Sequence, residues 1–205
     1  MRVVLVLIAA LVAVSAGVSG CAREKQPVVV PEVPQFTTGA PPPSGEATAG
    51  RPVPKTCGDV VSQDDIGTVL GTLIGDARPV VGVPQPSIGR TARLDCYYGL
   101  SGNRPVSSAT VWIGLATYTD PKHAQQRLTY TISTERDAGS QINEVPVGAG
   151  DGVLMRGKTW MLVAMRGRTT VVVSIRPNLV REDRAGAMLG QLADEALTPN
   201  TPAGG

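Results

Sequence analysis

The stretch VLMRGKTWMLVAMRGRTTVVVSIR, residues 153–176, decides the fold of this chain. Three runs rich in β-branched, aliphatic and aromatic residues are separated by the tripeptides RGK and RGR, and the glycine in each permits a tight turn. This pattern predicts three consecutive antiparallel strands that form a meander, at residues 153–156, 159–166 and 169–176.

Two kinds of periodicity fill the sequence before and after the meander. Alternation with a period of two predicts three earlier strands, at residues 80–83, 92–98 and 108–118. A spacing of three and four predicts three helices: a capped one that starts after Ser62 and ends at Gly71, one that starts at Asp120, and one over residues 185–196 that ends before Pro199.

The order of these elements is helix, strands, helix, three strands, helix. It predicts an α+β fold, in which a single domain over residues 56–198 has an antiparallel sheet, a three-stranded C-terminal meander and about three helices packed mainly on one face.

The composition excludes one class of function. The chain has 19 Lys and Arg residues and 17 Asp and Glu residues, which gives a formal net charge of +2, and it has one Phe, two Trp and four Tyr. A nucleic-acid-binding protein is expected to carry clustered basic residues and stacking aromatics, so we expect no nucleic-acid partner.

The first twenty residues have the features of a lipoprotein signal peptide. Arg2 precedes an apolar run over residues 3–14, which is shorter than the roughly 20 residues that a transmembrane helix needs. Residues 18–21, VSGC, look like the lipobox of bacterial lipoproteins, in which the cysteine receives a diacylglyceryl group and the chain is cut before it. We therefore expect Cys21 to anchor the protein at the extracytoplasmic face of the cell membrane. An uncleaved membrane anchor is the alternative.

The next segment, residues 21–55, is rich in Pro, Gly and Thr and includes Pro41-Pro42-Pro43. Such a composition cannot build a core, so we expect a disordered linker that holds the domain away from the membrane. Residues 199–205 are expected to form a disordered tail.

If Cys21 carries lipid, the two remaining cysteines form one even pair in an exported protein. This predicts a disulfide between Cys57 and Cys96. The alternative is a pair of thiols that bind a metal or act as a redox centre, but the two cysteines lack CxxC spacing and the chain has a single His.

The domain resembles DUF3558, a domain of unknown function in actinobacterial, mycobacterial-type lipoproteins. The resemblance rests on Cys57 before a short helix that ends in Leu-Gly, on Cys96 in an aromatic strand, and on the Gly-Asp turn GDG at residues 150–152. It implies a bridge between the two cysteines. This chain departs from the family in carrying Tyr97 and Tyr98 where a nearby tryptophan is common. The resemblance implies no catalytic residues.

No motif for catalysis or cofactor binding stands out. His123 falls in the first turn of a predicted helix, where side chains usually face solvent, and no GxSxG motif accompanies it. The glycines at residues 148–152 lead into a strand and not a helix, unlike those of a phosphate-binding loop. We expect no enzyme activity, no catalytic residue, no cofactor and no metal site. The carboxylates Asp95, Asp120, Asp137 and Glu144 are scattered along the sequence, and a dyad formed by two of them is the alternative.

The most suggestive feature is that both faces of the predicted sheet are apolar. Trp112 and Tyr118 share one face of their strand, and Trp160 lies in the meander. If helices leave one face open, these three residues form a candidate ligand or partner surface. The alternative is that helices or chain ends cover both faces.

Three functions are consistent with this sequence. We expect a non-enzymatic lipoprotein that binds an envelope component or a protein partner. A carrier of an apolar molecule or lipid would need an internal cavity, and a cell-wall-active enzyme would need a cleft with clustered carboxylates.

Overall fold

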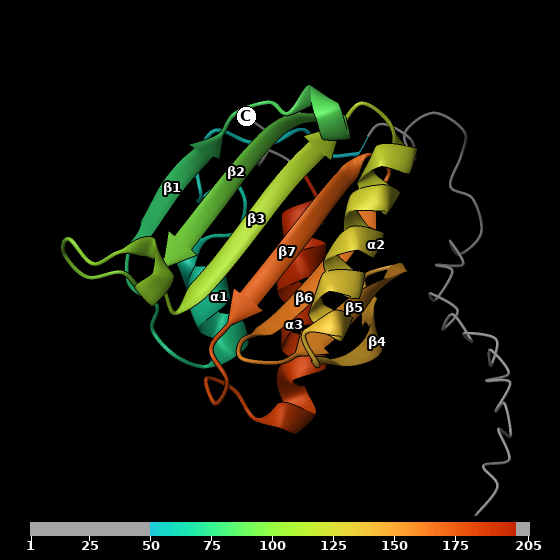
Figure 1. Ribbon diagram of the computed structural model, residues 1–205. Coiled ribbons are helices and arrows are strands. Elements are labelled where there is room, and N and C mark those ends of the chain that lie inside the picture. Colours follow the sequence, from blue (N-terminus) through green and yellow to red (C-terminus); the bar gives the residue numbers. More distant parts are fainter. Residues whose placement is uncertain (1–49, 200–205) are drawn as a thin grey trace, which may run out of the picture. The chain divides into compact units, whose positions relative to one another are not determined.

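The computed structural model describes residues 50–199, and these form a single α+β domain (Figure 1). Its antiparallel sheet has seven strands in the order β1-β2-β3-β7-β6-β5-β4. The strands are β1 (Ala77–Gly82), β2 (Arg90–Tyr98), β3 (Val111–Tyr118), β4 (Gln141–Val147), β5 (Gly150–Arg156), β6 (Trp160–Arg166) and β7 (Thr169–Ile175). The predicted meander is confirmed as β5, β6 and β7.

The three predicted helices are confirmed as α1 (Gln63–Leu70), α2 (Pro121–Asp137) and α3 (Glu182–Leu197). Ser62 caps α1 by accepting a hydrogen bond from the Asp65 amide, and Gly71 ends it in the left-handed conformation that glycine adopts without strain. Asp120 caps α2 by accepting from the His123 amide. Among residues 50–199, none of the helices is both long and apolar enough to cross a bilayer.

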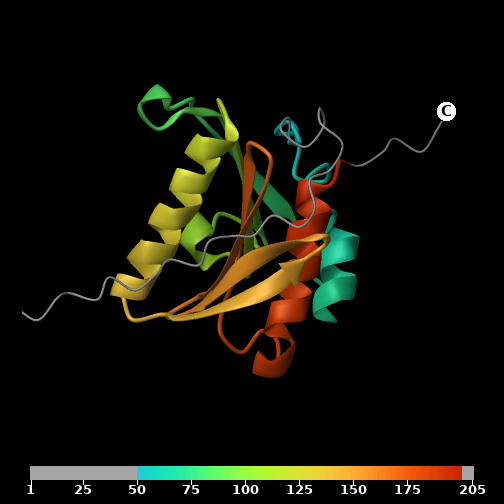
Figure 2. The same cartoon turned by 90° about the vertical axis from the view of Figure 1, so that its right-hand side faces the viewer.

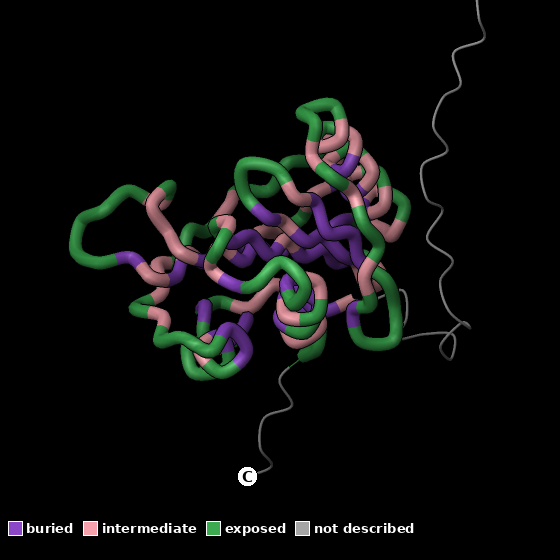
Figure 3. Tube along the Cα trace, turned by 90° about the horizontal axis from the view of Figure 1, so that it is seen from below, coloured by how far each residue is buried: buried purple, intermediate pink, exposed green. Residues whose placement is uncertain are grey.

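The helices lie on both faces of the sheet (Figure 2). Two of them, α1 and α3, pack on the face that carries Val111, Ile113 and Leu115 of β3, where the larger core cluster forms. The third, α2, packs on the opposite face, where Ala124 meets Ala116. Both faces of the strands are therefore apolar because both are packed, and the buried positions gather along the strands between the helices (Figure 3).

The sequence did not reveal β4, which pairs with β5 at one edge of the sheet. Its burial pattern is irregular, and Pro146 interrupts it. The opposite edge strand, β1, also carries a proline, Pro79. Because proline has no backbone N–H to donate, both edges lack a donor that an added strand would need.

Cys57 and Cys96 form a disulfide, as predicted, with their Cα atoms 5.6 Å apart. The bond ties the segment before α1 to the centre of β2. Beside it, the buried Tyr98 hydroxyl donates to the carbonyl oxygens of Cys57, at 3.2 Å, and Val61, at 2.9 Å. With both sulfur atoms in this bond, neither cysteine is a free thiol that could bind a metal.

The packed region begins before the boundary at residue 56 that we predicted. Arg51 is only 6% exposed. Its guanidinium donates to the carbonyl oxygens of Ala196 at 2.7 Å, Glu195 at 3.3 Å and Val60 at 3.4 Å, and also to that of Asp59. The predicted signal peptide, Cys21, the rest of the linker to residue 49, and residues 200–205 lie outside the described part of the chain.

Candidate ligand groove on the open sheet face

Helix α2 covers only part of its face of the sheet and leaves a groove beside it. The helix packs against β3, β4, β5, β6 and β7, whereas β1 and β2 lie beyond it (Figure 1). The groove has a volume of about 200 Å³. Its floor carries the small residues Gly114 and Ala116 with Val172, one side carries Arg93 and Trp112, and α2 forms the other side.

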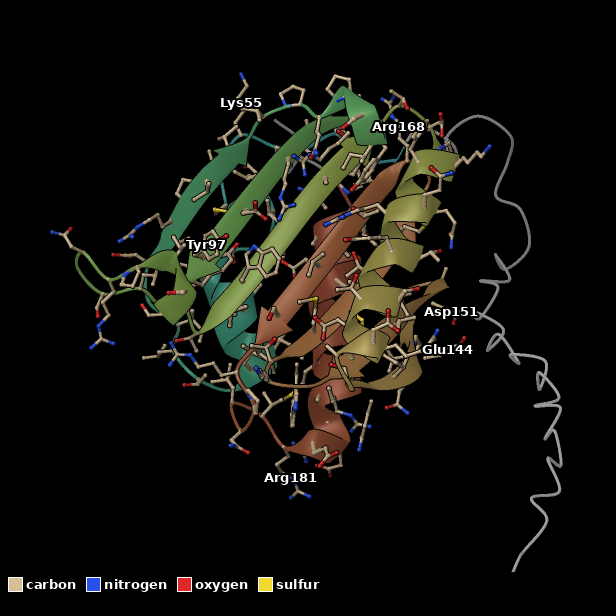
Figure 4. The ribbon with its side chains drawn as sticks, in the orientation of Figure 1. Lys55, Tyr97, Glu144, Asp151, Arg168 and Arg181 are labelled. Carbon is tan, nitrogen blue, oxygen red and sulfur yellow. A yellow bond between two sulfur atoms is a disulfide. The ribbon has the colours of Figure 1, made fainter. Side chains whose placement is uncertain are left out.

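Two stacked aromatic rings lie beside the groove, and we call this pair the Trp112–Tyr97 platform. Tyr97 of β2 and Trp112 of β3 are direct cross-strand partners. Their ring planes differ by only 11°, and the ring centroids are 6.2 Å apart. Figure 4 shows Tyr97 on β2, on the same face as α2. Parallel aromatic pairs of this kind stabilise each other beyond the area that they bury.

Gly114 makes room for this platform. A Cβ atom at Gly114 would lie 2.7 Å from Asp95 Oδ1 and 3.2 Å from Cζ2 of Trp112. The indole of Trp112 therefore extends over Gly114, and Nε1 of the ring donates to Asp95 Oδ1 at 3.0 Å. A residue with a side chain at position 114 would displace one of these partners.

Asp95 also holds an arginine in place next to the platform. Arg93 donates from Nε to Asp95 Oδ2 at 2.6 Å and from Nη2 to Oδ1 at 2.9 Å. The hydrogen bonds to Asp95 raise the pKa of Arg93. Cζ of this guanidinium lies 6.0 Å from the centre of the Trp112 ring. Asp95, itself 6% exposed, thus fixes both neighbours before any ligand arrives.

The α2 side of the groove is polar and carries a positive charge at Arg127 and a negative charge at Glu135. Cζ of Arg127 lies 5.1 Å from the ring centre of Tyr130, which is 61% exposed. Thr131 and Thr134 also line the groove, and their hydroxyl groups donate to the carbonyl oxygens of Arg127 and Tyr130. Among the described residues, Arg127 has no carboxylate partner, so its charge is available to a ligand.

Two of the three candidate residues from the sequence meet in this groove. Trp112 and Tyr118 both line it, and Tyr118 is buried at 2% exposure. Trp160 lies on the opposite face in the core beside α3 and is not part of the groove. Tyr97, Arg93 and Arg127 were not predicted from the sequence, because their proximity to Trp112 depends on strand register and on the position of α2.

One pair of carboxyl groups has perturbed acidity, and it lies away from the groove. Burial, together with a hydrogen bond and repulsion from Asp65, raises the pKa of Glu195 to about 7. A hydrogen bond from Ser62 contributes most to lowering the pKa of Asp65. The pair joins α1 to α3 next to Arg51, on the other side of the sheet from the groove. These shifts follow from helix packing.

His123 and the potential metal ligands also bear on chemistry. His123 lies in the first turn of α2, as predicted, with 38% of its side chain exposed, and its Nδ1 is 2.8 Å from Asp120 Oδ2. Within residues 50–199, no group of three or more His, Cys, Asp or Glu side chains is placed to hold a metal ion.

Comparison with protein-family models gives no match, and comparison with curated proteins gives none either. The resemblance to DUF3558 lipoproteins therefore stays a prediction. Among solved structures, the extracellular domain of PknH from Mycobacterium tuberculosis is similar, with a TM-score of 0.40 and 11% sequence identity over 65% of this chain and 90% of that chain. A similarity this distant assigns no function, which has to come from the geometry of the groove.

Proposed function

We propose that this protein is a non-enzymatic, lipid-anchored binding module of the cell envelope, which binds an envelope component through the groove beside α2. The observation that carries this proposal is the Trp112–Tyr97 platform. Aromatic residues held rigid at an open surface lose little conformational entropy on binding, so they are typical of binding sites.

The size of the groove favours a partner surface over a carrier. Pockets that enclose a small molecule usually have a volume of about 300–1,000 Å³. The groove measures about 200 Å³. It therefore suits one part of a larger partner better than a whole lipid.

The groove also lacks the features expected of a cell-wall enzyme. Among residues 50–199, the carboxyl group with a strongly raised pKa is that of Glu195, which belongs to the packing of α1 and α3 and does not line the groove. Glu135 lines the groove and accepts a hydrogen bond from Ser140 at 2.7 Å, and Asp95, next to the groove, pairs with Arg93. Binding is the function that these arrangements support.

The extracytoplasmic location in this proposal rests on the lipobox-like residues 18–21 and on the disulfide, since structural disulfides persist in oxidising compartments. Cys21→Ser tests the anchor. We expect the variant to accumulate as an unprocessed or released protein, measured by fractionation and by mass spectrometry of the N-terminus. Unchanged membrane attachment with unchanged processing would contradict the anchor.

A photo-crosslinking amino acid at position 134 tests the groove in native envelopes. Thr134 lines the groove, whereas Gln191 of α3 is exposed and does not line it, so position 191 is the matched control. We expect a defined crosslinked product from position 134 and not from position 191. Equal products from both positions, or no product from position 134, would contradict the groove as the binding site.

A further inference from the structure

Residues of the groove combine a flat apolar surface with hydrogen-bonding groups at its sides. The Trp112–Tyr97 platform provides the flat surface, and Arg93 and Asp95 adjoin it on β2. Thr131 and Thr134 face the groove from α2. A ligand that fits must present one apolar face and a polar edge.

A sugar ring has this combination. One face of a pyranose carries C–H groups with a slight positive charge, which are attracted to the negative face of an aromatic ring. The hydroxyl groups around its edge can bond to guanidinium, carboxylate and threonine groups. Tyr97 adds a second aromatic ring, with its centroid 6.2 Å from that of Trp112, and two rings favour a chain of sugars over a single sugar.

An extended peptide fits the same surface less well. A peptide that adds to a sheet uses free backbone groups at a strand edge, and both edge strands carry a proline. The platform lies instead on β2 and β3, whose backbone groups are paired with β1, β7 and each other. Side chains are therefore what this face offers to a ligand.

The charge of the groove selects among glycans. Asp95 neutralises Arg93. Glu135 keeps its negative charge and accepts from Ser140, but it lies eight positions, about 12 Å, along α2 from Arg127, so the two charges are separated. Arg127 lines the groove with no carboxylate partner among the described residues. A negatively charged ligand complements this charge, and a guanidinium binds a carboxylate with two parallel hydrogen bonds.

Resting on the function proposed above, we infer that the groove binds a glycan chain whose sugars carry carboxylates. The sugar rings stack on Trp112 and Tyr97, and Arg127 pairs with a carboxylate. Asp95 acts as a positioning residue, because it fixes the indole and the Arg93 guanidinium.

A pair of matched ligands tests this inference on the full mature chain. The first is a soluble strand of alternating N-acetylglucosamine and N-acetylmuramic acid without stem peptides, in which each muramic acid keeps a free lactyl carboxylate. The second is a chito-oligosaccharide of equal length, which has the same backbone without carboxylates. Titration is followed by tryptophan fluorescence with Trp160→Phe as background, so that Trp112 is the only indole.

We expect saturable binding of the carboxylated strand and a change in Trp112 emission. Trp112→Ala should weaken binding, measured by calorimetry, roughly tenfold or more, because a ring that stacks on the ligand is lost. Arg127→Gln should weaken binding of the carboxylated strand by roughly threefold or more and leave the neutral oligosaccharide unaffected. Leu73→Ala, at a side chain that is 99% exposed and outside the groove, should change neither.

Three results would overturn the inference: no binding of the carboxylated strand, equal binding of both ligands, or binding that Arg127→Gln leaves unchanged. Arg127 is at the surface of α2, so this variant stays informative even if Trp112→Ala fails to fold. Crosslinks from position 134 to a protein, together with no glycan binding, would refute the glycan and leave the groove as the binding site. Absence of both would refute both proposals.

Discussion

Gly114→Ala should displace the indole of Trp112 and destabilise the fold, although the added methyl group contacts no ligand. The added Cβ would lie 2.7 Å from Asp95 Oδ1, which cannot move freely because Arg93 and Trp112 both bond to that carboxylate. It would also lie 3.2 Å from the indole. Overpacking of this kind costs about 1–3 kcal/mol in the free energy of unfolding, and the indole should tilt away from Tyr97.

Urea unfolding measures this cost, and the chemical shift of the Trp112 indole N–H reports the ring. Gly150→Ala is the control, because Gly150 also lies in a strand and the nearest atom to its added Cβ is 3.9 Å away. We expect the control to change stability by less than about 0.5 kcal/mol. Wild-type stability and an unshifted indole signal in Gly114→Ala would refute the reasoning that Gly114 makes room for the platform.

Three more predictions concern the core. Reduction of the Cys57–Cys96 disulfide, with 39 positions between its ends, should lower the free energy of unfolding by about 3–4 kcal/mol, measured as a shift of the urea midpoint with reductant; an unchanged midpoint would contradict it. Arg51→Ala should lower the free energy of unfolding by about 2–3 kcal/mol, since carbonyl groups at the end of α3 lose their hydrogen-bond donor. A midpoint of thermal unfolding equal to that of the wild type would contradict this. The raised pKa of Glu195, about 7 against an ordinary 4.5, means that its contribution to stability is full below pH 4.5 and is lost as pH rises to about 7. Glu195→Gln should therefore make the free energy of unfolding depend less on pH between pH 5 and 7. The expected difference is about 1 kcal/mol or less, because the carboxyl group is partly exposed. An unaltered pH dependence would contradict the raised pKa.

Local signals in the sequence were enough for much of the fold. Ser62 and Asp120 predicted the starts of two helices because a capping side chain satisfies amides of the next turn. The meander followed from turn glycines between β-rich runs. The edge strand β4 was missed because Pro146 interrupts its pattern, and the sequence assigned Arg51 to the linker because its burial depends on carbonyl groups at the far end of the chain.

The groove was only partly predictable, for a physical reason. Trp112 was identified from its own strand, whereas its pairing with Tyr97 depends on the β2–β3 register. The two tryptophans fell on opposite faces because β3 and β6 both pair with β7, and this sets which alternate residues share a face. The position of α2 on the second face was likewise invisible in the sequence, since α2 is amphipathic whichever face it covers.

The two tryptophans allow the most direct test of the claim that ligands bind in the groove. Each gives a separate indole N–H signal in a nitrogen-15 spectrum of the mature chain. Trp112 lines the groove, and Trp160 lies in the core on the opposite face. On addition of solubilised envelope material, we predict that the Trp112 signal shifts and the Trp160 signal stays in place. A shift of Trp160 alone, or binding that moves neither signal, would contradict the claim.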